Sequence, residues 1–196
     1  MRTCSRFRSG PAPAWTELCR AVLACSLCLS PSAQAPKAAS WPRVYIEDAF
    51  TRDAVVWALS GAARWLADER CRSVLSEFRD ERDRTLASRL DTYGVDAPTY
   101  LTLLLFRDGS GAKACADDMT FAVTTPGGRA VFVCGRRFAR VWRESAADAQ
   151  AVIIHEMLHT LGLGENPPPS HAITERILTL CDTTRKTAVR RPKRRV

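Results

Sequence analysis

His155-Glu156-Met157-Leu158-His159 is the stretch from which the rest of this 196-residue chain can be understood. Two histidines four positions apart lie on one face of an α-helix, one turn from each other. There their neutral imidazoles can bind one divalent cation, for which zinc is the usual choice. The glutamate between them lies beside the cation without having to bind it, and it can act as a general base toward water. The stretch therefore predicts a helical metal site with His155 and His159 as ligands.

The residues around this stretch predict that its helix is buried. Ser145 is a good helix N-cap, and Asp148 follows at the third helical position, where an acid is favourable. Apolar side chains surround the two histidines: Val152, Ile153, Ile154, Met157, Leu158 and Leu161. A helix that is apolar on most sides is buried, and polar side chains inside it need partners. A metal ion would satisfy both imidazoles and the nearby carboxylate.

The residues after His159 decide where a third ligand can come from. A continued helix would carry residue 165 roughly 15 Å along its axis from His155. Gly162 and Gly164 permit the helix to end and the chain to reverse. Glu165 is therefore our first candidate for the third ligand.

The stretch from His155 to Glu165, HEMLHTLGLGE, resembles the HExxHxxGxxH pattern of the metzincins, a group of zincin metalloproteases. Both histidines, Glu156 and Gly162 match that pattern residue for residue. Glu165 stands where the third histidine of the pattern would be. No methionine follows Met157, so the Met-turn of the metzincins is absent. More loosely, the chain is similar to small exported bacterial proteins of unassigned function that carry a comparable LHTLGLGENPP run.

The resemblance implies a zinc-dependent peptidase. Its cofactor would be Zn²⁺, its substrate a peptide or protein, and Glu156 the general base for hydrolysis of the peptide bond. It also implies an edge strand beside the cleft that pairs with an extended substrate, a role for which residues 130–134 are a candidate. Two alternatives remain for the third ligand. His171 offers an imidazole, and Glu175 lies on a later helix, from which the related gluzincins draw a carboxylate.

Other functions fit the same sequence. A non-catalytic zinc-binding domain would have a closed site with four protein ligands, for which His155, His159, Glu165 and His171 would suffice. A metal-free binding module, held by disulfides, would instead use a basic tail to engage an anionic partner. A hydrolase that acts on a cell-wall amide would share the chemistry of a peptidase.

The N-terminus predicts a signal peptide over residues 1–35 and a secreted or periplasmic protein. Residues 21–29 form an apolar core that is far too short to span a bilayer, and Ala33-Gln34-Ala35 has the form of a cleavage site. Four arginines make up the basic segment before the cut: Arg2, Arg6, Arg8 and Arg20. Residues 36–42, rich in proline and alanine, are expected to be a linker.

The net charge of +8 comes from the ends of the chain. Residues 36–184 carry 18 basic and 20 acidic side chains, whereas residues 185–196 carry seven basic and no acidic ones. A nearly neutral body predicts no specific nucleic-acid partner. We expect the last twelve residues to be a disordered basic tail, with at most weak contact with an anionic surface. We expect a monomer without a transmembrane segment.

Eight cysteines divide evenly between the leader and the rest of the chain. The four beyond the leader are Cys71, Cys115, Cys134 and Cys181. Four cysteines in an exported domain predict two disulfides, with three possible pairings. We favour Cys115–Cys134 across a hairpin and Cys71–Cys181 between an early helix and the last one.

These patterns together predict an α+β fold over residues 43–184, a small zincin-like domain. Its short, mostly antiparallel sheet would pack on helices, among them the buried helix of the metal site. Apolar spacing predicts helices over residues 52–69, 72–79, 84–93 and 136–143, with a last helix from Ser170 to Cys181. Short apolar runs predict strands at 44–46, 100–106, 120–124 and 130–133, the last two joined as a hairpin through Pro126-Gly127-Gly128.

Overall fold

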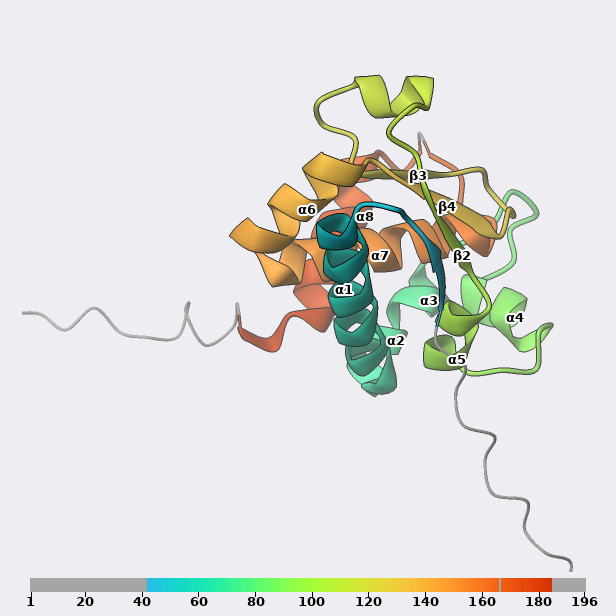
Figure 1. Cartoon of the computed structure of the whole chain (residues 1–196). Helices are drawn as coiled ribbons and strands as arrows, with labels where there is room; N and C mark the ends of the chain where they lie inside the picture. The colour runs from blue at the N-terminus through green and yellow to red at the C-terminus, as the bar shows by residue number, and fades with distance from the viewer. Residues whose placement is uncertain (1–41, 166, 185–196) are drawn as a thin grey trace, which may run out of the picture. The chain divides into compact units, whose positions relative to one another are not determined.

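The computed structural model describes residues 42–165 and 167–184 (Figure 1). The predicted signal peptide, all but the last residue of the linker and the basic tail lie outside the described residues. No helix in the described part of the chain has both the length and the apolar character to cross a bilayer.

Helices make up most of the ordered structure. The α-helices are α1 (Ala49–Ala67), α2 (Glu69–Arg72), α3 (Val74–Glu77), α4 (Leu86–Asp91), α5 (Ala97–Thr102), α6 (Gly135–Glu144), α7 (Ala146–Thr160) and α8 (Ser170–Cys181), with one 3₁₀ turn, η1 (Lys113–Ala116). The strands are β1 (Arg43–Tyr45), β2 (Leu105–Asp108), β3 (Ala122–Thr124) and β4 (Ala130–Val133). The predicted α+β class is therefore confirmed.

The four strands form one sheet in the order β1-β2-β4-β3. The predicted hairpin is confirmed, because β3 and β4 pair antiparallel. The expectation of a mostly antiparallel sheet is wrong, since β1 pairs parallel with β2 and β2 pairs parallel with β4. Five helices separate β1 from β2, and a connection of that length lets the chain return to the end of the sheet at which β1 began, so that β2 runs parallel to it.

The predicted strand over residues 100–106 is also wrong in its first half. Tyr100 belongs to α5, and β2 begins only at Leu105. Asp96 caps α5 by accepting a hydrogen bond from the backbone N–H of Thr99 at 2.8 Å, and Pro98 stands in the first turn, where proline is tolerated. A short apolar run does not distinguish a buried helix from a buried strand. Here the Asp96 cap favours a helix over the first residues of the run.

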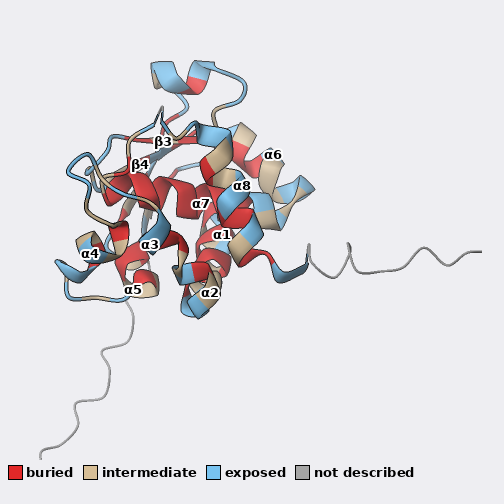
Figure 2. Cartoon of the chain, turned by 180° about the vertical axis from the view of Figure 1, so that it is seen from behind, coloured by how far each residue is buried: buried red, intermediate tan, exposed pale blue. Residues whose placement is uncertain are grey.

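Helix α7 is the centre of the core (Figure 2). It packs against α1, α6, α8 and β3, and every residue from Ala151 to Thr160 is buried. The predicted cap is confirmed, because Ser145 Oγ accepts a hydrogen bond from the Asp148 N–H at 3.1 Å. The apolar residues on all sides of α7 thus place the motif histidines inside the protein.

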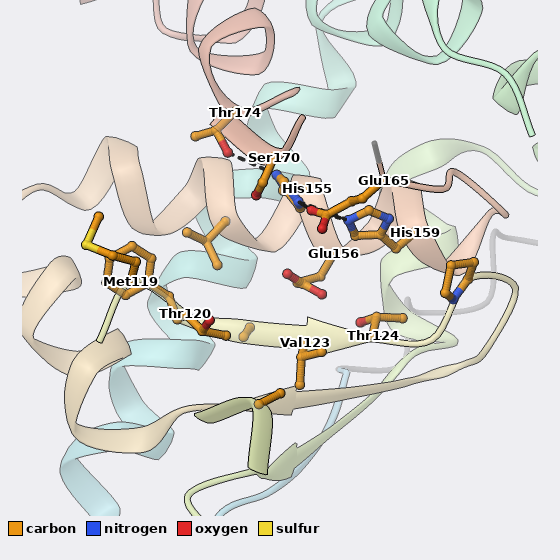
Figure 3. A pocket seen from close by; sticks show the side chains of 15 residues that line it. Met119, Thr120, Val123, Thr124, His155, Glu156, His159, Glu165, Ser170 and Thr174 are labelled. Carbon is orange, nitrogen blue, oxygen red and sulfur yellow. Dashed lines mark hydrogen bonds and ion pairs between the residues drawn. The ribbon is translucent and has the colours of Figure 1, made fainter. Parts of the chain in front are cut away.

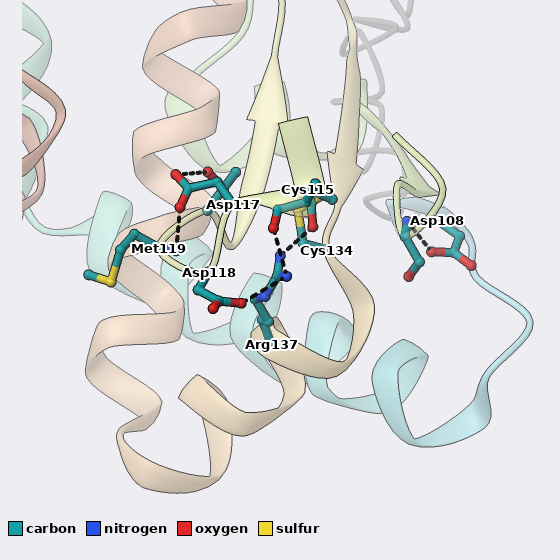
Figure 4. The surroundings of a disulfide bond; sticks show 10 residues. Asp108, Cys115, Asp117, Asp118, Met119, Cys134 and Arg137 are labelled. Carbon is teal, nitrogen blue, oxygen red and sulfur yellow. Dashed lines mark hydrogen bonds and ion pairs between the residues drawn. A yellow bond between two sulfur atoms is a disulfide. The ribbon is translucent and has the colours of Figure 1, made fainter. Parts of the chain in front are cut away.

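Both favoured disulfides are present. Cys71–Cys181 joins α2 to the end of α8, with 4.5 Å between the Cα atoms. Cys115–Cys134 joins η1 to the residue before α6, with 5.3 Å between the Cα atoms (Figure 4). Beside the second bridge, Arg137 donates a hydrogen bond to the Cys115 carbonyl oxygen and forms an ion pair with Asp118 at 3.2 Å. The segment between β2 and β3 is therefore held to α6 at several points.

We expect the Cys71→Ser/Cys181→Ser variant to lose about 1.5 kcal/mol more unfolding free energy than the Cys115→Ser/Cys134→Ser variant. The bridges span 110 and 19 residues, respectively, and the longer loop restricts the unfolded chain more. Urea denaturation of both variants, followed by circular dichroism, measures the two losses. The reverse order would show that native packing at the shorter bridge outweighs loop length.

Candidate metal centre

The chain reverses direction directly after α7, as the glycines predict. Gly162 has a φ of 108°, a backbone conformation that residues other than glycine rarely adopt. The N–H groups of Gly162 and Leu163 donate hydrogen bonds to the carbonyl oxygens of His159 and Leu158, at 2.8 and 3.1 Å. This turn supplies hydrogen bonds to carbonyl oxygens at the end of the helix and brings Glu165 back toward the two histidines.

Three atoms that can each donate an electron pair converge at this point (Figure 3). The Nε2 atoms of His155 and His159 are 3.0 Å apart. Glu165 Oε1 lies 3.3 Å from the first and 3.4 Å from the second. A tetrahedral metal ion with ligands at about 2.0–2.1 Å holds those ligands about 3.3–3.4 Å apart. The triangle therefore has nearly the size that one ion requires, and the group can hold a metal ion.

The other ring nitrogens of the histidines are held by the protein. His159 Nδ1 lies 2.7 Å from the Leu163 carbonyl oxygen. A carbonyl oxygen can only accept, so Nδ1 carries the proton in the neutral ring and Nε2 presents a lone pair to the centre. His155 Nδ1 lies 2.9 Å from Thr174 Oγ1, and with the hydroxyl accepting, the same tautomer results. Outer contacts of this kind orient metal-binding histidines.

Burial keeps the His155 ring neutral. Burial and, to a smaller extent, the neighbouring His159 lower the pKa of His155 to about 4, while Glu165 acts in the opposite direction. A neutral imidazole is the form that binds metals. His155 is therefore a neutral ligand at neutral pH.

Glu156 points from α7 toward β3, away from the side where Glu165 stands (Figure 3). Its Oε2 atom is buried and accepts no hydrogen bond from the described residues. Burial raises the pKa of Glu156 to about 7, although Thr124 and His159 favour the ionised form. The Thr124 hydroxyl lies close enough for this effect but does not have the geometry of a hydrogen bond. A buried carboxylate oxygen without a partner is costly, so Glu156 would be stabilised by a group bound beside it.

The centre opens into a cavity of about 330 Å³. Its walls come from α7, β3, the segment before β3 and the start of α8, and are lined by Ala114, Met119, Thr120, Phe121, Ala122, Val123, Thr124, Pro126, Val152, His155, Glu156, His159, Glu165, Ser170 and Thr174. β3 is the edge strand beside this cavity, because the sheet ends there. Our candidate for that role, residues 130–134, is wrong, because residues 130–133 form β4, which pairs on both sides with β2 and β3.

The alternative ligands are not brought to the centre. His171 and Glu175 are exposed on α8 and lie outside the group formed by His155, His159 and Glu165. Sequence reasoning missed Thr174, whose hydroxyl contacts His155 from the same helix. No local pattern marks this threonine, because its role depends on how α8 packs against α7.

Comparison with protein-family models, with curated proteins and with solved structures found no match.

Replacing Glu165 with alanine is expected to weaken Co²⁺ binding by more than about tenfold, because one of three converging donors is lost. Visible absorption during Co²⁺ titration reports both affinity and coordination. Glu175→Ala is the matched control, since it removes the same charge from the exposed surface of α8 and should leave the affinity unchanged. Equal losses in both variants would show that Glu165 acts only through charge at a distance.

Thr174→Val keeps the shape of the side chain and removes its hydroxyl. We expect Co²⁺ affinity to fall by about 10- to 100-fold, because His155 loses the contact that orients its ring. Thr179→Val serves as the control, since Thr179 is exposed on the same helix and its hydroxyl only donates to the Glu175 carbonyl oxygen at 2.9 Å. Unchanged affinity in Thr174→Val would mean that packing alone orients His155.

Proposed function

We propose that this protein is an exported zinc-dependent peptidase that hydrolyses peptide bonds. The observation that carries the proposal is the triangle of His155, His159 and Glu165 donor atoms, with Glu156 beside it in the same cavity. The resemblance of residues 155–165 to the zincin metalloproteases is consistent with this arrangement.

The choice of zinc follows from the donors. Two imidazoles and one carboxylate are a usual ligand set for zinc in hydrolases, where the fourth position stays open. The described residues bring three donors together and no fourth. This favours a catalytic site over the closed, four-ligand site of a structural zinc domain. When bound, zinc acts as a Lewis acid and makes water a competent nucleophile near neutral pH.

Glu156 moves the proton in the proposed reaction. Glu156 lines the same cavity as the three donor residues, which places its carboxylate beside the position of the attacking water. The water oxygen forms a bond to the peptide carbonyl carbon, the carbon–nitrogen bond breaks, and Glu156 passes the proton to the leaving nitrogen. The buried surroundings keep bulk water from competing for that proton.

The edge strand gives an extended peptide a place to bind. β3 has one neighbour, β4, and its other edge borders the cavity. A peptide that adds to this edge gains main-chain hydrogen bonds irrespective of its sequence. Thr124 on β3 lies beside Glu156 on α7, so a peptide paired with the free edge of β3 would lie next to the metal centre (Figure 3).

Export is supported by the two disulfides, which form and persist in oxidising compartments. The predicted signal peptide leads to the same inference.

We expect Glu156→Gln to retain zinc and to lose more than about a hundredfold in peptide hydrolysis, because the proton acceptor is gone while the ligands remain. Elemental analysis of protein purified from the periplasm of an expression host measures the zinc. Mass spectrometry of a broad peptide library measures cleavage. Glu175→Gln, an equal change of charge on exposed α8, should cleave like the native protein.

Two results would contradict the proposal. Equal cleavage by the native protein and Glu156→Gln would remove Glu156 from the mechanism. Stoichiometric zinc without cleavage of any peptide, including peptides cross-linked through cell-wall amides, would favour a non-catalytic zinc domain.

A further inference from the structure

A second cavity, of about 270 Å³, lies on the other side of the turn that follows β3. Pro126 lines both this cavity and the metal cleft. The second cavity is lined by Asp80, Glu81, Arg82, Arg84, Arg89, Pro126, Gly127 and Gly162. Three of these residues are arginines: Arg82 and Arg84 from the segment between α3 and α4, and Arg89 from α4. Two are acids, Asp80 and Glu81.

Asp80 organises this arginine-rich segment. Its buried carboxylate accepts hydrogen bonds from the Arg84 side chain at 2.7 and 2.9 Å and from the backbone N–H groups of Arg82 and Arg84 at 2.9 and 3.0 Å. Burial raises the pKa of Asp80, but these hydrogen bonds outweigh it and the net shift is downward. Asp80 is therefore ionised, and its charge is committed chiefly to Arg84.

The guanidinium groups of Arg82 and Arg89 have N–H groups that donate no hydrogen bond to the described residues. The Arg82 side chain is exposed and has no hydrogen bond or ion pair with the described residues. Arg89 Nε lies 3.6 Å from Asp80 Oδ2, an ion pair too long for a hydrogen bond, and no other described group accepts a hydrogen bond from this buried N–H. A buried N–H without a partner is costly, and a planar guanidinium matches a carboxylate particularly well. A carboxylate in this cavity would lie among the guanidinium groups that line it.

The cavity is connected to the metal cleft by the backbone. β3 runs along the cleft and leads into the turn at Pro126, where the Gly127 N–H donates to the His159 carbonyl oxygen at 2.8 Å. On the other side of the cavity wall, Gly162 belongs to the reversal that returns Glu165 to the centre. Since Pro126 lines both cavities, a peptide that extends past the end of β3 would have to cross this turn to reach the arginines.

We propose that Arg82 and Arg89, beside the Asp80–Arg84 pair, form a subsite for a carboxylate of the peptide, which sets substrate preference at one end of the cleft. The inference rests on the proposed peptidase function. The carboxylate can come from the C-terminus of the peptide or from an acidic side chain, since both present the same pair of oxygens.

The test measures binding to the zinc-loaded Glu156→Gln protein, so that it does not depend on hydrolysis. Three pools of randomised pentapeptides are used in equilibrium dialysis: one with a free C-terminal carboxylate, one with a carboxamide, and one with a carboxamide after a fixed glutamate. We expect the free-acid pool to be retained about tenfold more than the plain carboxamide pool. Retention of the glutamate pool would show that side-chain carboxylates bind as well, and its absence would restrict the subsite to chain ends.

Arg82→Gln and Arg89→Gln, each added to Glu156→Gln, are expected to abolish the preference for the free acid. Arg82 is exposed and makes no side-chain contact that its loss could break, so its variant should keep the native thermal midpoint. Arg107→Gln, an equal change of charge on the exposed surface of β2, should keep the full preference.

A preference for the carboxylate-bearing pools that survives in both arginine variants, or equal retention of all three pools by the parent protein, would overturn the subsite. Hydrolysis of the free-acid pool by the native protein is followed separately. Retention with preference but without hydrolysis would keep the carboxylate subsite and overturn the peptidase. Hydrolysis without preference would keep the peptidase and overturn the subsite.

Discussion

Two imidazoles inside an apolar helix are the constraint on which the arrangement of this protein depends. Neither His155 nor His159 can be buried in α7 unless both of its ring nitrogens are satisfied. The Nδ1 atoms find Thr174 and the Leu163 carbonyl oxygen. The Nε2 atoms face each other and Glu165, an assembly of electron-rich atoms that a cation would stabilise.

Satisfying those nitrogens requires that α8 be held firmly against the rest of the domain. Cys71–Cys181 anchors the end of α8 to α2. Arg176 in the middle of α8 donates two hydrogen bonds of 2.5 Å to the Glu77 carboxylate on α3, which lowers the pKa of Glu77. Both attachments lie within two turns of Thr174. The early helices therefore contribute to the metal centre through α8, although no residue of theirs lines its cavity.

The turn after β3 links the centre to its surroundings on the opposite side. The Gly127 N–H of this turn donates a hydrogen bond to the His159 carbonyl oxygen at the end of α7. The turn also lines a cavity together with the arginine-rich segment between α3 and α4. One face of this turn borders the metal cleft and the other borders the second cavity. The turn thus separates a site suited to chemistry from a site suited to an anion.

Local patterns in the sequence determined the helix that carries the ligands, its Ser145 cap, its burial and the reversal at Gly162, because capping, apolar spacing and backbone freedom act over a few residues. They also led to the β3–β4 hairpin and to both disulfides. Only the tertiary structure decided the parallel pairing of β1, β2 and β4, the split of residues 100–106 between helix and strand, and the contact of Thr174 with His155. It also brought Glu165 to the centre and left His171 and Glu175 exposed, because those outcomes depend on how segments distant in sequence pack together, which no short window of residues specifies.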